Sequence, residues 1–169
     1  DPANGIYKPA DVTPHWQEVG KYSRMPIDGT IMEIDPVQSS YPASRLYKAI
    51  QQIDSPTTAI EFIRLVREAV FVFNQNISNP KVLKSIVQDL YKNNETINTA
   101  TILDLANSKK GQELLQDDFN LVRQLGVRGF PTIVIVNSDN QGTKIVGGRD
   151  LNVYISAIET LNNNNKSAP

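Results

Sequence analysis

One loop carries the residues best suited to binding chemistry, the segment 126–132 with the sequence Gly-Val-Arg-Gly-Phe-Pro-Thr. It follows a helical pattern and precedes the apolar run Ile133–Val136. A cis peptide bond costs little only when proline follows it. A cis bond before Pro131 would expose the backbone of Phe130 to an extended peptide, whereas a trans proline would merely begin a strand, where its missing N–H is tolerated. A cis bond at Pro131 would therefore make the loop a peptide-binding surface, and a trans bond would leave it the start of a strand.

The rest of the sequence offers no catalytic or metal-binding group. The chain has no cysteine, so it can form neither a thiolate nor a disulfide. His15 is the only histidine, which leaves a zinc site to carboxylates, and a Ser-His-Asp triad would lack its G-x-S-x-G motif. Asp117 and Asp118 would point about 100° apart on a helix. Gly147-Gly148-Arg149 lacks the spacing of a phosphate loop. We predict no catalytic residue, no metal and no cofactor.

The composition is that of an ordinary globular protein of 169 residues. Lysine and arginine total 17 against 18 for aspartate and glutamate, so the basic surface of a nucleic-acid-binding protein is missing. No apolar stretch approaches the roughly 20 residues that span a bilayer, and no signal peptide is recognisable. We therefore expect a soluble protein that binds neither nucleic acid nor membrane. Its start at Asp1 is consistent with removal of an upstream segment.

Four regions follow one another along the chain. Five prolines in residues 1–40 permit only a short helix, near Val12 to Arg24, so this region is predicted to be an irregular wrapping segment. Residues 41–126 have the 3.6-residue periodicity of a helical domain. Residues 127–161 contain strand, turn and helix patterns in that order. Residues 162–169 form a polar tail, for which we expect a frayed end.

The helices of the second region are marked by their first residues. Ser55-Pro56 provides the N-cap and first-turn proline of one helix, and Ser78-Asn79-Pro80 opens the next. A short helix is predicted over Thr99–Ala106, and Gly126 suits the left-handed residue that follows a helix. The buried stripe predicted after Ser55 comprises Ala59, Phe62, Ile63, Val66, Val70 and Phe73.

The hydrophobic periodicity of the third region differs from that of the helical region before it. Thr132–Asn137 is β-branched and apolar on both faces, as in a strand covered from both sides. Ser138–Gly142 has turn composition and Thr143–Val146 can return, which predicts a hairpin. Asp150 is predicted to cap a final helix, whose buried face would be Leu151, Tyr154, Ile155, Ile158 and Leu161.

This order of loop, hairpin and helix resembles the C-terminal half of the thioredoxin fold, and the helical region resembles the insertion of DsbA-like proteins. Ser39–Arg45, Ser-Ser-Tyr-Pro-Ala-Ser-Arg, is similar to the S-x-P-A-S-R-A entry to that insertion in the cytoplasmic FrnE-like, or disulfide-isomerase-like, branch. Arg67–Phe71 and Asn76–Ser78 are similar to its Q/R-x-A-x-F and N-I-S stretches. The resemblance covers most of residues 11–160.

The resemblance implies an α/β, thioredoxin-like fold with a large helical insertion, here mostly helical with a C-terminal hairpin and helix. It implies that Pro131 is cis and that Gly129, Phe130 and Thr132 frame the substrate-binding surface. Phe130 could instead pack against the helical region, and both interpretations stay open. Family members begin with a strand, a C-x-x-C motif on a helix and a second strand. No such unit is readable here, so no catalytic cysteine can be assigned.

Three functions remain open. The resemblance implies a thiol-disulfide oxidoreductase or isomerase of the DsbA family, represented here without its redox cysteines. The alternative is a non-catalytic thioredoxin-like adaptor that presents a partner protein, as in the YjbH-like branch, which shares Asn76–Ser78 and Val153–Ile155. The third is a remnant without activity. The first two require a protein or peptide at the cis-proline loop. The resemblance implies a cytoplasmic location, with the periplasm and secretion still open.

The apolar run at 133–136 also predicts an unpaired sheet edge. A strand that is apolar on both faces belongs inside a covered sheet, yet only one other strand is readable, and a two-stranded hairpin is marginal alone. Prolines make the segment Ile6–Val37 a poor source of a further strand. We therefore expect this edge to pair with a second copy of the chain, giving a homodimer, or with a retained N-terminal fragment.

Overall fold

The computed structural model describes residues 5–23 and 25–165. The chain divides into two compact units, Asp1–Asp117 and Asp118–Pro169. The division falls within one helix, α7 (Lys109–Gln124), which begins in the first unit and ends in the second. Each unit is described by itself. Among the described residues, no helix is long and apolar enough to cross a membrane.

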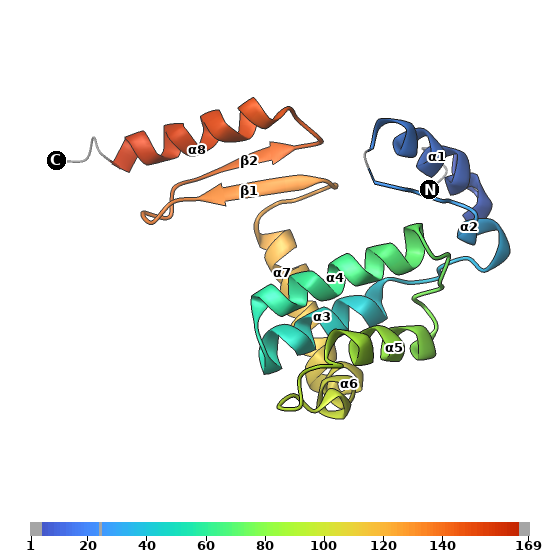
Figure 1. The fold of residues 1–169 in the computed structure, drawn as a ribbon. Helices are drawn as coiled ribbons and strands as arrows, with labels where there is room; N and C mark the ends of the chain where they lie inside the picture. The colour runs from blue at the N-terminus through green and yellow to red at the C-terminus, as the bar shows by residue number, and fades with distance from the viewer. Residues whose placement is uncertain (1–4, 24, 166–169) are drawn as a thin grey trace. The chain divides into compact units, whose positions relative to one another are not determined.

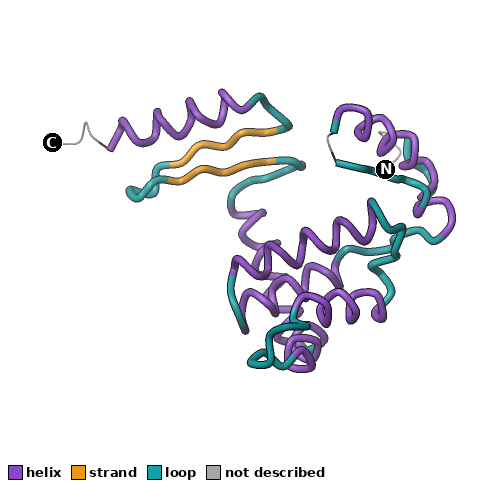
Figure 2. Tube along the Cα trace, in the orientation of Figure 1, coloured by secondary structure: helices purple, strands orange, loops and turns teal. Residues whose placement is uncertain are grey.

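The first unit is helical, as predicted (Figures 1 and 2). Helix α4 has Ser55 as its N-cap, whose Oγ accepts a hydrogen bond from the Thr58 N–H at 3.1 Å. Asn79 caps α5 in the same way through the Lys81 N–H. Both caps confirm the predicted helix starts. The helices before α7 are the 3₁₀ turn η2 (Pro9–Val12), α1 (Thr13–Tyr22), α2 (Ile31–Ile34), α3 (Tyr41–Ile53), α4 (Pro56–Phe71), α5 (Pro80–Leu90) and α6 (Thr99–Asn107).

The first unit has a continuous apolar core. Helix α3 packs against α4 and α6, and the largest fully buried side chains are Phe62, Ile31, Ile50, Ile102 and Val87. At the edge of this core the Tyr91 hydroxyl donates to Asp54 Oδ2 at 2.9 Å. Burial, together with this hydrogen bond, raises the pKa of Tyr91 above its ordinary value. The helical unit therefore buries a core without help from the second unit's strands.

Two sequence predictions for this unit need correction. Phe73 was assigned to the buried stripe of α4, but it is 62% exposed because the helix ends at Phe71 and the 3.6-residue period stops with it. The first forty residues were expected to hold only one short helix, yet α2 forms as well, with Ile31 fully buried in the core. The predicted first helix ends at Tyr22, and Arg24 lies outside the described residues.

Helix α2 is held by hydrogen bonds from a distant segment. The Ile31 N–H donates to Asn74 Oδ1 at 3.0 Å, and Asn74 Nδ2 donates to Asp28 Oδ2 at 2.7 Å. Hydrogen bonds from the Thr30 side chain and backbone, and then from Asn74, hold the pKa of Asp28 below its ordinary value. Asn74 has a positive φ of 50°, a conformation that asparagine tolerates better than most residues.

The next residues of the same segment hold the chain that follows α2. Ser78 Oγ accepts hydrogen bonds from the N–H groups of Gln38 and Ser39, at 2.8 and 3.0 Å. Asn76 Nδ2 donates to Asp35 Oδ1 at 2.8 Å. We call residues 28–39 the strap, and Asn74, Asn76 and Ser78 the clamp. The Asn-Ile-Ser motif thus has a structural role, since it fixes the strap to the helical core.

The second unit contains an antiparallel hairpin and a helix. Strand β1 (Thr132–Val136) pairs with β2 (Gly142–Val146), with Thr132 opposite Val146 and Val136 opposite Gly142. Helix α8 (Leu151–Asn165) packs along both strands. The hairpin and final helix confirm the predicted elements. The helix continues to Asn165, four residues into the predicted polar tail, because residues 162–165 contain no glycine or proline. Residues 166–169 lie outside the described part.

The second unit leaves its apolar residues largely uncovered. Of the face predicted to be buried on α8, only Leu161 is buried, at 8% exposure, whereas Leu151, Ile155 and Ile158 are exposed. Strand β1 was expected to be covered on both faces, but its side chains are only half-buried or exposed. The reason is that the sheet in the described chain has two strands, which one helix cannot enclose.

Candidate functional site

The candidate loop begins where helix α7 ends. Gly126 has a positive φ of 62°, as the sequence predicted for the residue after this helix. The Val127 N–H donates to Val122 O and the Gly126 N–H to Arg123 O, at 3.1 and 3.0 Å. This pair of hydrogen bonds is the Schellman motif, which satisfies helix carbonyls that would otherwise have no partner. The motif fixes the direction in which the chain enters the loop.

Lys144 of strand β2 adds a second attachment at the same point. Its Nζ donates to the carbonyl oxygens of Leu125 and Gly126, at 3.1 and 3.0 Å. A cation is favourable at a helix C-terminus, where the backbone carbonyls carry partial negative charge. The ammonium group therefore connects the hairpin to the end of α7, with the loop between them.

The four predicted residues, 129–132, form the end of the loop that leads into β1. The Phe130–Pro131 peptide bond is cis. Pro131 O accepts a hydrogen bond from the Gly147 N–H at 2.8 Å, which continues the hairpin ladder by one step. The Thr132 hydroxyl donates to Gly129 O at 2.7 Å and so closes the loop across the proline. These bonds hold the two ends of the loop and leave its middle open.

The middle of the loop has hydrogen-bond donors that are not used within the described chain. Within residues 5–23 and 25–165, the backbone N–H groups of Arg128, Gly129 and Phe130 have no partner, and neither does the Arg128 guanidinium. The Phe130 ring is 81% exposed, so the burial required by the second interpretation of this residue is not found. An exposed aromatic ring beside unpaired backbone groups is a surface on which an extended peptide can bind.

A pocket of about 470 Å³ lies beside the loop. Gly129 and Thr132 line it, whereas Phe130 and Pro131 do not. Its other walls include Arg128 and Lys144, two cations that sequence reasoning did not assign to the site. No local signal in the sequence identifies Lys144, because its contacts are to the carbonyl oxygens of Leu125 and Gly126, 19 and 18 residues away. The pocket thus combines backbone donors with positive charge and suits an acceptor-rich peptide backbone.

The candidate site contains no pair of groups suited to covalent chemistry. Its side chains are cationic, hydroxyl or apolar, and no thiol occurs anywhere in the 169 residues. Within the part of the chain that the structure describes, no cluster of three or more His, Cys, Asp or Glu side chains could hold a metal ion. The arrangement offers backbone donors, positive charge and an exposed aromatic ring, which suit the binding of a peptide.

Comparison with known proteins gives a family match over nearly the whole chain. The family model described as "Thioredoxin" matches residues 10–156. A structure solved for a proposed protein disulfide isomerase from Nitrosomonas europaea superposes with a TM-score of 0.73 at 20% identity, covering 89% of this chain and 72% of the other. This likeness shows a thioredoxin-like fold with a helical insertion.

The curated relatives are named as adaptors. The ClpXP adapter protein SpxH of Halalkalibacterium halodurans is 27% identical over 163 residues, which are 93% of this chain and 51% of the relative. The protein of the same name from Shouchella clausii is 31% identical over 150 residues, 88% of this chain and 47% of the relative. The chain therefore spans about half the length of the curated relatives that it matches.

Proposed function

Because this chain belongs to the thioredoxin family, we propose that it acts as a non-catalytic adaptor that binds an extended segment of a partner protein at residues 128–132. The observation that carries the proposal is the loop itself, with an exposed Phe130 ring next to three unpaired backbone N–H groups. Relatives named as ClpXP adapters support the same function. The resemblance to a cytoplasmic branch supports a cytoplasmic setting.

In this proposal three of the predicted residues have a role. Phe130 is exposed and its backbone N–H has no partner within the described residues, so an extended peptide can form main-chain hydrogen bonds there as an added strand does. Phe130 supplies apolar contact, and aromatic side chains commonly dominate such interfaces. Thr132 and Gly129 hold the loop closed behind the peptide through their hydrogen bond.

A test requires a probe, because the partner is unidentified. Random decapeptides displayed on phage should yield binders when selected on the immobilised full chain. Phe130→Ala is expected to weaken those binders by about tenfold or more, since removal of an aromatic anchor typically costs about 2 kcal/mol or more. Phe73→Ala is the matched control, because this phenylalanine is similarly exposed but lies in the helical unit. Equal affinity for the parent and Phe130→Ala would contradict the proposal.

Thiol-disulfide exchange is the second candidate function, supported by the same family and by the same loop. It would require cysteines from a segment outside these 169 residues, because the chain itself contains none. Such a segment would have to act together with the loop.

The chain alone is expected to leave insulin reduction by dithiothreitol unchanged. No residue in it can form a thiolate or a mixed disulfide, so it cannot turn over the insulin disulfides. Turbidity of precipitating insulin chains, compared with a protein-free control and with an equal mass of serum albumin, measures this directly. Reproducible acceleration by the pure chain would show that the adaptor assignment is wrong.

A further inference from the structure

A second pocket lies in the helical unit, away from the loop in sequence. It has a volume of about 680 Å³, within the range of ligand-binding pockets. The strap forms one wall and the C-terminal half of α4 forms another. Its apolar lining includes Trp16, Met32, Val37, Val70, Phe71 and Ile77.

The walls of this pocket are fixed by contacts already described. Ser78 of the clamp holds Gln38 and Ser39 of the strap, both of which line the pocket. On the opposite side the rings of Trp16 and Phe71 meet edge to face, with centroids 4.8 Å apart. The pocket is therefore a built feature of the fold, since both walls are held by specific contacts.

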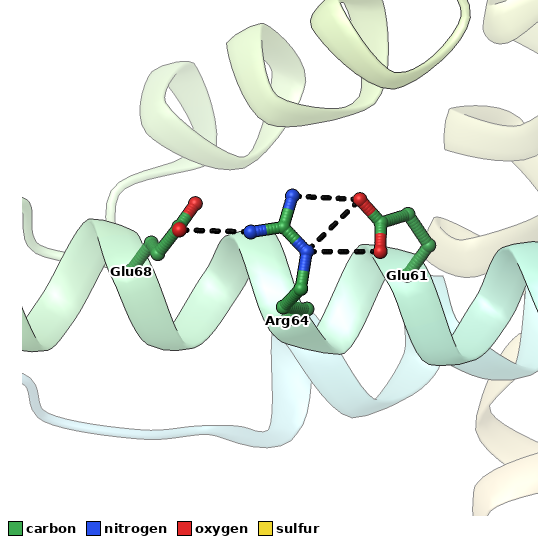
Figure 3. Close-up of polar contacts among 3 residues, drawn as sticks. All are labelled: Glu61, Arg64 and Glu68. Carbon is green, nitrogen blue, oxygen red and sulfur yellow. Dashed lines mark hydrogen bonds and ion pairs between the residues drawn. The ribbon is translucent and has the colours of Figure 1, made fainter. Parts of the chain in front are cut away.

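One charged group lines the pocket, and it has no partner. Within residues 5–23 and 25–165, the side chain of Arg67 on α4 makes no hydrogen bond and no ion pair. Arg64, one turn earlier on the same helix, is fully engaged: it binds Glu61 at 2.7 Å and Glu68 at 2.8 Å (Figure 3). These bonds, chiefly the one to Glu61, raise the pKa of Arg64. Arg64 therefore already has carboxylate partners in this chain, whereas Arg67 has none among the described residues.

We propose that this pocket binds an acidic polypeptide segment, with a bulky aliphatic side chain inserted between the strap and α4 and a neighbouring carboxylate paired with Arg67. Charge complementarity selects the acidic residue, because Arg67 is the unpaired cation of this pocket within the described residues. The apolar lining selects the aliphatic side chain. The backbone N–H groups of Gln38 and Ser39 cannot replace Arg67, since they already donate to Ser78.

A polypeptide fits the pocket better than a free fatty acid does. Small-molecule sites bury most of the ligand surface, commonly about 70–90% or more. This pocket is open to solvent, and Tyr41, one of its lining residues, is exposed. An open groove covers one side of its occupant, which suits a side chain carried on a backbone that runs outside the groove. Tyrosine, tryptophan and arginine at such a site are the residues that most often dominate protein interfaces.

Trp16 reports on this pocket directly, because it is the chain's only tryptophan and lines the site. We would titrate the full chain with a decapeptide that has one leucine flanked by glutamates, and record Trp16 fluorescence. Saturable quenching or a spectral shift is expected with this peptide. Two control peptides are each expected to bind at least about tenfold more weakly. The lysine control has lysines in place of the glutamates, and the serine control has serine in place of leucine.

Arginine variants identify the carboxylate contact. Arg67→Gln is expected to lower the affinity for the acidic peptide about tenfold. It should also abolish the chain's preference for the acidic peptide over the lysine control. Arg64→Gln is the matched control and should retain both, because Arg64 does not line this pocket. Phe130→Ala should also leave the titration unchanged, so the result stands apart from the function proposed for the loop. Far-UV circular dichroism verifies that each variant is folded.

Three outcomes would overturn the proposal. The first is a Trp16 signal that does not saturate with the acidic peptide. The second is equal binding to Arg67→Gln and to the parent. The third is tighter binding of dodecanoate than of the peptide, which would make the pocket a fatty-acid site.

Discussion

Replacing Gly111 with alanine is expected to lower the free energy of unfolding of the helical unit by about 3 kcal/mol. Gly111 is the buried residue in the first turn of α7, where this helix leaves α6. A Cβ added there would lie 2.8 Å from the carbonyl oxygen of Ala106 and closer still to that of Leu105. Both neighbours are backbone atoms, so no side-chain rotation can relieve the overlap.

Two opposing effects determine the sign of this change in stability. Helix propensity alone would make alanine more favourable than glycine by about 1 kcal/mol inside a helix. Steric overlap with two carbonyl groups opposes this preference and outweighs it, because the turn between α6 and α7 must open to relieve the overlap. Urea denaturation followed by circular dichroism at 222 nm measures the difference. Gly148→Ala is the control, since a Cβ there has no neighbour within 4 Å. An unchanged or increased stability of Gly111→Ala would contradict the packing argument.

The second large expected effect concerns the free edge of β1. Hydrogen-bonding residues alternate along an antiparallel pair. The Gly147 N–H donates to Pro131 O, and the Asn137 N–H donates to Gln141 O, at the two ends of the hairpin. It follows that the backbone N–H and C=O groups of Ile133 and Ile135 bond to β2. The backbone groups of Thr132, Val134 and Val136 point to the outer edge of β1, which has no partner strand in the described sheet.

We expect a second copy of the chain, or a retained N-terminal fragment, to pair with this edge and cover the exposed apolar side chains of the hairpin. Light scattering should then give about twice the chain mass of 18.8 kDa, or native mass spectrometry should show a bound fragment. Val134→Pro should abolish either association completely, because proline removes the outward N–H without touching the β1–β2 ladder.

Val146→Pro provides the matched control for this experiment. Val146 lies opposite Thr132 and directs its backbone to the outer edge of β2, so the same substitution blocks only the other edge. Association that survives Val146→Pro but not Val134→Pro assigns the contact to β1. A parent chain that behaves as an 18.8 kDa monomer, without bound peptide and with a cooperative thermal transition, would show the expectation to be wrong.

Local signals in the sequence account for most of the fold. Ser55 and Asn79 mark helix starts because a cap requires only a side-chain oxygen and an N–H group two or three residues later. Gly126 marks a helix end for an equally local reason, its positive φ. The hairpin follows from a change of hydrophobic period at Thr132. Features whose cause lies within a few residues were therefore predictable.

Features that depend on distant partners were not predictable. Helix α2 exists because Asn74 accepts from Ile31, 43 residues away, and such a pair leaves no periodic trace in the sequence. Lys144 likewise belongs to the candidate site because its Nζ donates to carbonyl oxygens 18 and 19 residues away. The period of residues 151–161 predicts a buried face on α8, but only Leu161 of that face is buried, because a periodic pattern does not supply the surface that would cover it.

The clamp has a consequence for the chemical ageing of the protein. Both of its amides donate a hydrogen bond to a carboxylate, Asn74 to Asp28 at 2.7 Å and Asn76 to Asp35 at 2.8 Å. Deamidation of either asparagine would replace a donor by a second carboxylate at that distance, and like charges so close repel each other. The attachment of the strap to the helical core would then weaken without any change in the gene, although the Ser78 hydrogen bonds and the burial of Ile31 would remain. The stability of this pocket wall therefore depends in part on the chemical lifetime of two amide groups.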